Sequence, residues 1–62
     1  MLDHLKFLLD LEEEVKKMIR ILDNVERMIG KMEREELLLL LKLANTLMEK
    51  IYRIKVGISK RL

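Results

Sequence analysis

The 62-residue sequence contains no cysteine, proline or tryptophan. Without cysteine, the chain has no disulfides, no thiolate metal ligands and no cysteine nucleophile. Without proline, it lacks the residue that most strongly interrupts a helix, so long continuous helices are allowed. Aromatic residues are limited to Phe7 and Tyr52, which leaves burial to aliphatic and methionine side chains and provides no platform for stacking nucleobases.

The sequence also lacks the motifs that carry catalysis or cofactor binding. Its two glycines, Gly30 and Gly57, are too far apart to form a phosphate-binding loop. Thr46 and Ser59 have no base at a defined spacing that could activate their hydroxyls. We therefore expect a protein that is not an enzyme and that uses no cofactor.

Metal ligands are equally sparse. His4 is the single histidine, and no glutamate precedes it by three residues, as the paired sites of helical bundles require. Glu12, Glu13 and Glu14 are consecutive, so they spread over about 200° of a helix and do not converge. We expect no metal site.

The chain shows no sign of export or of crossing a membrane. Its first residues carry an acidic side chain where a secretory signal carries basic ones. The longest apolar stretch, residues 37–48, contains Lys42 and Asn45 and is shorter than the roughly 20 residues of a spanning helix. We therefore expect a cytoplasmic protein without a transmembrane segment.

Charged residues make up 39% of the chain. Together with the absence of cysteine and glutamine, this composition resembles that of small proteins from hot environments, in which ion-pair networks are favoured. A designed bundle would show a similar bias, so the composition does not separate the two origins.

Two heptad repeats of apolar residues run through the chain and lose phase near Gly30. Such a/d spacing is typical of packed helices. The first repeat comprises Leu8, Leu11, Val15, Met18, Leu22, Val25, Ile29 and Met32, and the second comprises Leu37, Leu40, Ala44, Leu47, Ile51, Ile54 and Ile58. Continuing the first register would place Glu36, Lys50 and Arg53 in the apolar seam, so two helices and a turn are favoured over one coil.

The predicted fold class is therefore all-α: a single antiparallel helical hairpin over residues 1–62. The first helix is expected at about 3–29, the turn at about 30–33, the second helix at about 34–56, and a short tail at 57–62. Asp3 is the expected N-cap or first-turn acid, and Gly30 is expected to end the first helix in a left-handed conformation. Gly57 is expected to end the second helix.

Three local patterns offer alternatives to continuous helices. Asp23 with Glu26, and Thr46 with Glu49, have capping-box spacing and could split a helix, but the seam passes both sites without changing phase. Residues 52–58 alternate branched and polar side chains, which is typical of a strand, although no second strand is available for pairing.

Each helix carries more apolar residues than one seam can cover. A helix that is apolar all round, as in residues 37–41, is normally buried on several sides. We therefore expect self-association, most simply two hairpins in a homodimeric four-helix bundle. The expected interface anchors are Phe7, Ile21, Leu38, Leu39 and Leu43.

Charge is distributed unevenly along the chain. Residues 1–30 have a net charge of −2 and residues 31–62 a net charge of +4, which favours antiparallel pairing in a salt-dependent way. In the first helix we expect intrahelical ion pairs such as Glu13 with Lys17. The densest basic cluster comprises Lys50, Arg53, Lys55, Lys60 and Arg61, against Glu49 alone.

The favoured hypothesis is a small non-enzymatic regulator, adaptor or assembly subunit that acts as a homodimeric bundle. An alternative is an RNA- or DNA-binding regulator in which Lys50, Arg53, Lys55, Lys60 and Arg61 contact phosphates. Two further alternatives are a subunit of a complex with another protein and a protein adsorbed to a membrane surface.

Overall fold

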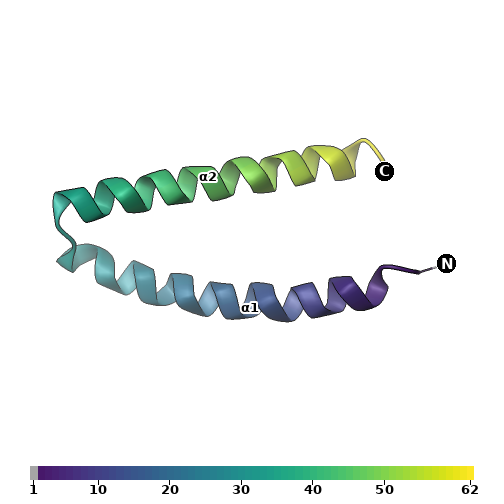
Figure 1. The fold of residues 1–62 in the computed structure, drawn as a ribbon, viewed down its shortest axis with the longest axis horizontal. Helices are drawn as coiled ribbons and strands as arrows, with labels where there is room; N and C mark the ends of the chain where they lie inside the picture. Colours follow the sequence, from purple (N-terminus) through teal and green to yellow (C-terminus); the bar gives the residue numbers. More distant parts are fainter. Residues whose placement is uncertain (1) are drawn as a thin grey trace. The chain divides into compact units, whose positions relative to one another are not determined.

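The computed structural model describes residues 2–62 and contains two α-helices joined by a short connection. Helix α1 spans Leu5–Met28, the 3-10 helix η1 spans Ile29–Lys31, and helix α2 spans Arg34–Ser59 (Figure 1). No strand occurs among these residues. The prediction of an all-α chain with two long helices is confirmed, whereas their antiparallel pairing and assembly into a bundle stay predictions.

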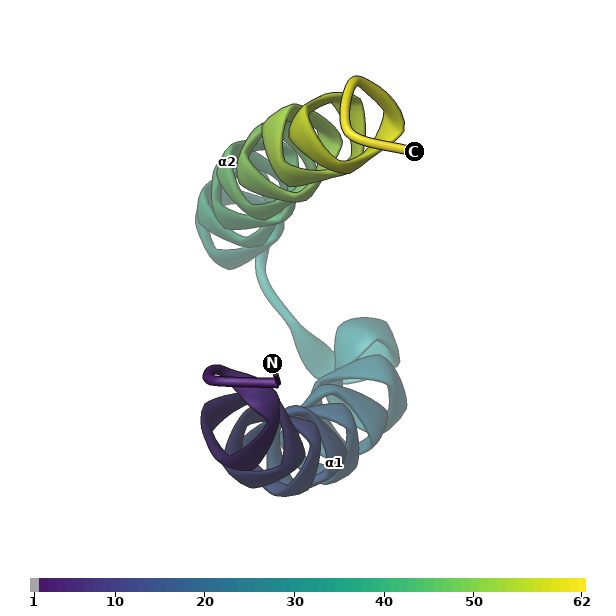
Figure 2. The same cartoon turned by 90° about the vertical axis from the view of Figure 1, so that its right-hand side faces the viewer.

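The chain divides into two units, one ending at Lys31 and the other beginning at Met32. Viewed end on, α1 and α2 are each an uninterrupted coil (Figure 2). The splits considered at Asp23 and Thr46 do not occur, because α1 and α2 run through these residues. No helix of the described chain has both the length and the apolar character needed to cross a membrane.

Helix α1 begins two residues later than predicted. The N-cap is His4, with φ −105° and ψ 3°, and its side chain makes no capping hydrogen bond. The Leu5 backbone N–H donates instead to the Leu2 carbonyl oxygen at 3.2 Å. Asp3 lies in the preceding turn and is neither the N-cap nor a first-turn acid. The assignment of Asp3 was wrong because this turn satisfies the Leu5 N–H, one of the unpaired donors at the helix start, through the backbone alone.

The end of α1 also differs from prediction. No glycine among residues 2–62 has a positive φ, so Gly30 is not a left-handed cap. The C-cap is Ile29, with φ −53° and ψ −43°, and the chain tightens into η1. A 3-10 turn pairs the last carbonyls of a helix without reversing the sign of φ, which explains why Gly30 keeps an ordinary conformation.

Helix α2 begins at a cap that the sequence analysis did not assign. Glu33 is the N-cap in an extended conformation, and its backbone N–H donates to Oε1 of Glu36 at 2.9 Å. Glu35 and Glu36 occupy the first turn, where their negative charge complements the positive end of the helix dipole. Met32 and Leu37 occupy the positions of a hydrophobic staple around this cap.

The predicted end of α2 at Gly57 is wrong, and so is the strand alternative for residues 52–58. The helix continues through Gly57 to Ser59, and the Lys60 backbone N–H donates to the Val56 carbonyl oxygen at 3.1 Å. Glycine permits a left-handed cap but does not require one. Restriction to one χ1 rotamer lowers the helix propensity of branched residues such as Val56 and Ile58 only slightly, and no second strand is available to stabilise the alternative.

Replacing Gly57 with Ala should stabilise the protein by about 0.5–1 kcal/mol, because Gly57 is helical and a Cβ there would have no neighbour within 4 Å. The free energy of unfolding, measured by urea denaturation at fixed protein concentration, tests this. Gly30→Ala is the companion variant, since its added Cβ also meets nothing within 4 Å. A loss of stability in Gly57→Ala would show that this position needs the left-handed conformation.

Replacing Glu36 with Ala should cost about 0.5–1 kcal/mol of stability, because the Glu33 backbone N–H loses its acceptor. Glu36→Gln keeps an acceptor oxygen at the same distance from the backbone and should retain most of the stability. Glu35→Ala removes a first-turn charge without touching this hydrogen bond. Equal effects of Glu36→Ala and Glu35→Ala in thermal unfolding would contradict a specific role for the cap.

Candidate functional site

The apolar side of α1 covers about half of the helix circumference. At about 100° per residue, apolar side chains continue from Met28 through Val25 and Leu22 to Ile19, over roughly 180°. No residue of α1 is buried, and even Leu22, in the centre of this side, is 39% exposed. The side is therefore much wider than the narrow seam of a two-stranded coil.

Helix α2 has an apolar side of similar width. It runs from Ile54 through Ile51 and Met48 to Leu38, over roughly 200° at 100° per residue. Again no residue is buried, although Leu40 and Val56 are half-buried. A single neighbouring helix covers only part of such a surface.

The five predicted interface anchors are all exposed, on different faces. Phe7 is 67% exposed and Ile21 is 55% exposed, and the two lie on one flank of α1. Leu39 and Leu43 are each 57% exposed and form an i,i+4 pair on one face of α2. Leu38 precedes Leu39, so its side chain lies about 100° around the helix. The five residues thus mark several apolar flanks rather than one compact patch.

The ion pairs of α1 are formed within the helix. Lys6 Nζ lies 3.2 Å from Asp10 Oδ2, and Lys17 Nζ lies 3.3 Å from Glu14 Oε1. The predicted pair of Glu13 with Lys17 is wrong. Glu13 lies 3.6 Å from Lys16 instead, because i,i+3 neighbours are also within reach on a helix surface.

The consecutive glutamates of α1 are used in these local pairs. Lys16 Nζ is 3.6 Å from Glu12 Oε1 as well as from Glu13. All of these side chains are more than half exposed, so each pair contributes at most a few tenths of a kcal/mol. The pairs keep α1 nearly self-neutralised in its first half.

The basic cluster near the end of α2 is much less compensated. Arg53 Nη2 lies 3.8 Å from Glu49 Oε2, and this is the one ion pair that α2 forms within its described residues. Lys50, Lys60 and Arg61 have no such partner within the helix. The cluster therefore presents an excess of positive charge to solvent.

The structure separates one predicted member of this cluster from the others. Lys55 lines a shallow hollow together with Met48, Ile51 and Tyr52, on the apolar side of α2. Arg53 precedes Lys55 by two positions and points about 200° away from it, and Lys50 precedes it by five positions and points about 140° away. Proximity in sequence had grouped side chains that helical geometry separates.

Lys42 was not recognised as part of the basic surface. It precedes Arg53 by 11 residues and Lys60 by 18, and both intervals are close to whole numbers of helical turns. The three side chains therefore lie in one line along α2. The same intervals in the sequence could have revealed this line.

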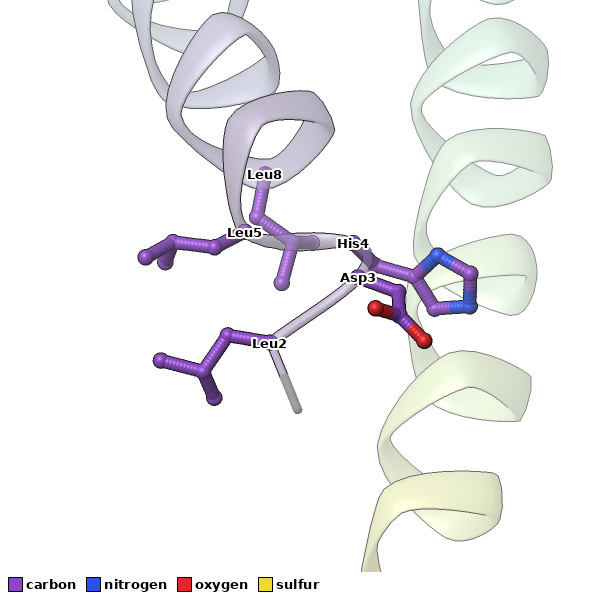
Figure 3. A pocket seen from close by; sticks show the side chains of 5 residues that line it. All are labelled: Leu2, Asp3, His4, Leu5 and Leu8. Atoms are coloured by element: carbon purple, nitrogen blue, oxygen red, sulfur yellow. The ribbon is translucent and has the colours of Figure 1, made fainter.

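A second hollow surrounds the beginning of α1. Leu2, Asp3, His4, Leu5 and Leu8 line it. Leu2 and Leu5 point to one side of the chain, and Asp3 and His4 point to the opposite side (Figure 3). Zinc requires at least three protein ligands, and residues 2–62 contain no group of three or more histidine and acidic side chains that could hold a metal ion.

One of the two candidate hydroxyl groups in α2, that of Thr46, is occupied locally. Thr46 Oγ1 donates a hydrogen bond to the Lys42 carbonyl oxygen at 3.0 Å. This bond to the preceding turn is a common way for threonine to satisfy its hydroxyl within a helix. The geometry does not resemble a hydroxyl activated by a neighbouring base.

Comparisons with protein-family models, curated proteins and solved structures found no match to this chain. Any function must therefore be inferred from the surfaces of the two helices.

Proposed function

We propose that this chain is a non-enzymatic interaction protein that acts as a homodimeric helical bundle, in the role of a small regulator, adaptor or assembly subunit. The observation that carries this proposal is the apolar side of each helix, which covers about half of the circumference and contains no buried residue. Each large apolar side chain gains about 1.5–3 kcal/mol when it is fully buried. Covering these sides is the largest free-energy gain available to the molecule.

A second copy of the chain fits this surface better than an unrelated partner. The first half of the sequence has a net charge of −2 and the second half +4, so an antiparallel arrangement brings opposite charges together. Ala44 lies in the middle of the second apolar seam, where a small side chain allows close helix packing. Two-fold pairing of hairpins gives a closed assembly without further exposed seams.

The proposal includes the absence of catalysis and a cytoplasmic location. Its support is the sparse polar chemistry of the sequence, in which Thr46 is held by its own helix and the acids of α1 pair with neighbouring lysines. A complex with a different protein is the competing arrangement, and measurement of the assembly distinguishes the two.

The purified chain should sediment at about twice its monomer mass of 7.5 kDa, and its thermal midpoint should rise with protein concentration. Sedimentation equilibrium and circular dichroism over a range of concentrations test this. A chain that is monomeric, fully helical and cooperative in unfolding at micromolar concentration would overturn the proposal. A monomer that becomes helical only with another protein would favour the hetero-complex.

Replacing Leu39 and Leu43 with Glu should weaken dimerisation at least about 100-fold, because two large apolar contacts are lost and two charges must be desolvated. The variant should become monomeric or lose helicity. Thr46→Glu with Lys50→Gln is the matched control, since it changes the net charge of the same helix by the same amount, outside its apolar seam, without removing an apolar side chain. Equal weakening by both pairs would show that charge, rather than the leucine pair, controls assembly.

A further inference from the structure

The basic residues of α2 lie on the side that faces away from its apolar seam. Lys42, Arg53 and Lys60 each follow a seam residue by two positions, namely Leu40, Ile51 and Ile58. A separation of two residues is about 200° on a helix, so these basic side chains point opposite to the seam. Packing through the seam leaves them in solvent, whichever partner covers the apolar side.

Lys50 lies on the flank of the same surface, about 80° from Lys42 at 100° per residue. Lys42, Lys50, Arg53 and Lys60 are called the basic face below. Its single acidic neighbour is Glu49, which pairs with Arg53 at 3.8 Å while both side chains stay about two-thirds exposed. An exposed pair of this kind is worth little, so Arg53 is readily available to another anion.

The basic face extends over about 27 Å from Lys42 to Lys60, at 1.5 Å per residue. This length corresponds to about eight base pairs of a nucleic-acid duplex. The face has no aromatic side chain on which an unpaired base could stack. Between Lys50 and Lys60 it contains no apolar side chain, and the position in its middle is Gly57.

These features separate a phosphate backbone from other anionic partners. Adsorption to a membrane surface requires apolar side chains beside the basic ones, and stable protein interfaces require aromatic or aliphatic anchors. Leu39 and Leu43 lie near Lys42 and Lys50 on the helix surface. The stretch from Lys50 to Lys60 has no apolar side chain on this face, and solvated cations of this kind are sufficient for the sequence-independent binding of phosphates. Lys55 is excluded from this surface because it lines the apolar hollow with Met48, Ile51 and Tyr52.

We infer that the basic face of α2 is a docking surface for the sugar-phosphate backbone of a nucleic-acid duplex, bound without sequence preference. Up to four phosphates contact each chain, and each contact releases counterions. Arg53 and Lys60 lie opposite the apolar seam, so their contacts do not depend on the proposed dimer, whereas Lys50 shares its flank of α2 with Leu39 and Leu43.

An electrophoretic mobility-shift assay tests this inference. The unmodified chain is mixed with a DNA duplex and an RNA duplex of the same sequence. Either duplex should be retained at 50 mM salt, with affinity falling on the order of 100-fold by 200 mM, as about four phosphate contacts per chain require. A scrambled duplex of equal length should bind equally well. No retention of either duplex at 50 mM salt, or binding to phosphatidylserine vesicles alone, would overturn the inference.

A matched pair of double variants tests the placement of the site. Lys42→Ala with Lys60→Ala should lower the affinity at 50 mM salt at least about tenfold and reduce the salt slope by about two. Lys31→Ala with Lys55→Ala removes the same charge from outside the basic face and should change the affinity less than threefold. Equal losses in both pairs would show that net charge, rather than this face, attracts the duplex.

Helicity and sedimentation of both double variants are measured in the same buffers. Both should match the unmodified chain, because alanine favours the helix and the changed lysines are exposed. If Lys42→Ala with Lys60→Ala abolishes retention of the duplex while sedimentation is unchanged, binding is assigned to the basic face. If sedimentation shows that assembly fails while the duplex is still retained, only the proposed dimer is contradicted.

Discussion

The apolar surface of each helix is the constraint on which the rest of this molecule depends. A narrow a/d seam is satisfied by one neighbouring helix, but the apolar sides of α1 and α2 extend over about half of their circumferences. With no buried residue in α1 or α2, neither helix has a core of its own. Helix formation alone contributes little stability in water, so tertiary or quaternary packing must supply most of it.

Electrostatics have a different role in the two helices. In α1, lysines and acids three or four positions apart pair with each other, which leaves little charge for outside partners. In α2, positive side chains outnumber acids after residue 37, and Glu49 alone provides local compensation. The apolar seam of α2 and the residues Lys42, Arg53 and Lys60 thus lie on opposite sides of the helix.

The number and approximate extent of the helices could be predicted from sequence because heptad spacing is a long-range and repeated signal. The ends could not, because several residues compete to terminate a helix within one turn. Gly30 and Gly57 have the freedom to adopt a left-handed conformation, yet the backbone near each continues with negative φ. The cap of α2 was missed because it relies on Glu36 accepting from the Glu33 backbone, and glutamate is an unusual N-cap. Grouping basic residues by proximity placed Lys55 with Lys50 and Arg53, although the helix separates them.

The hydrogen bond between Glu33 and Glu36 is contained within the first turn of α2. Together with the short-range ion pairs of α1, it means that coil-to-helix conversion is a unimolecular process on the microsecond scale. Encounter between chains is bimolecular and becomes slower with dilution. In the proposed dimer, newly synthesised chains at low abundance would therefore pass through a period in which nascent helices expose their apolar sides, and the expression level would set the lifetime of that species.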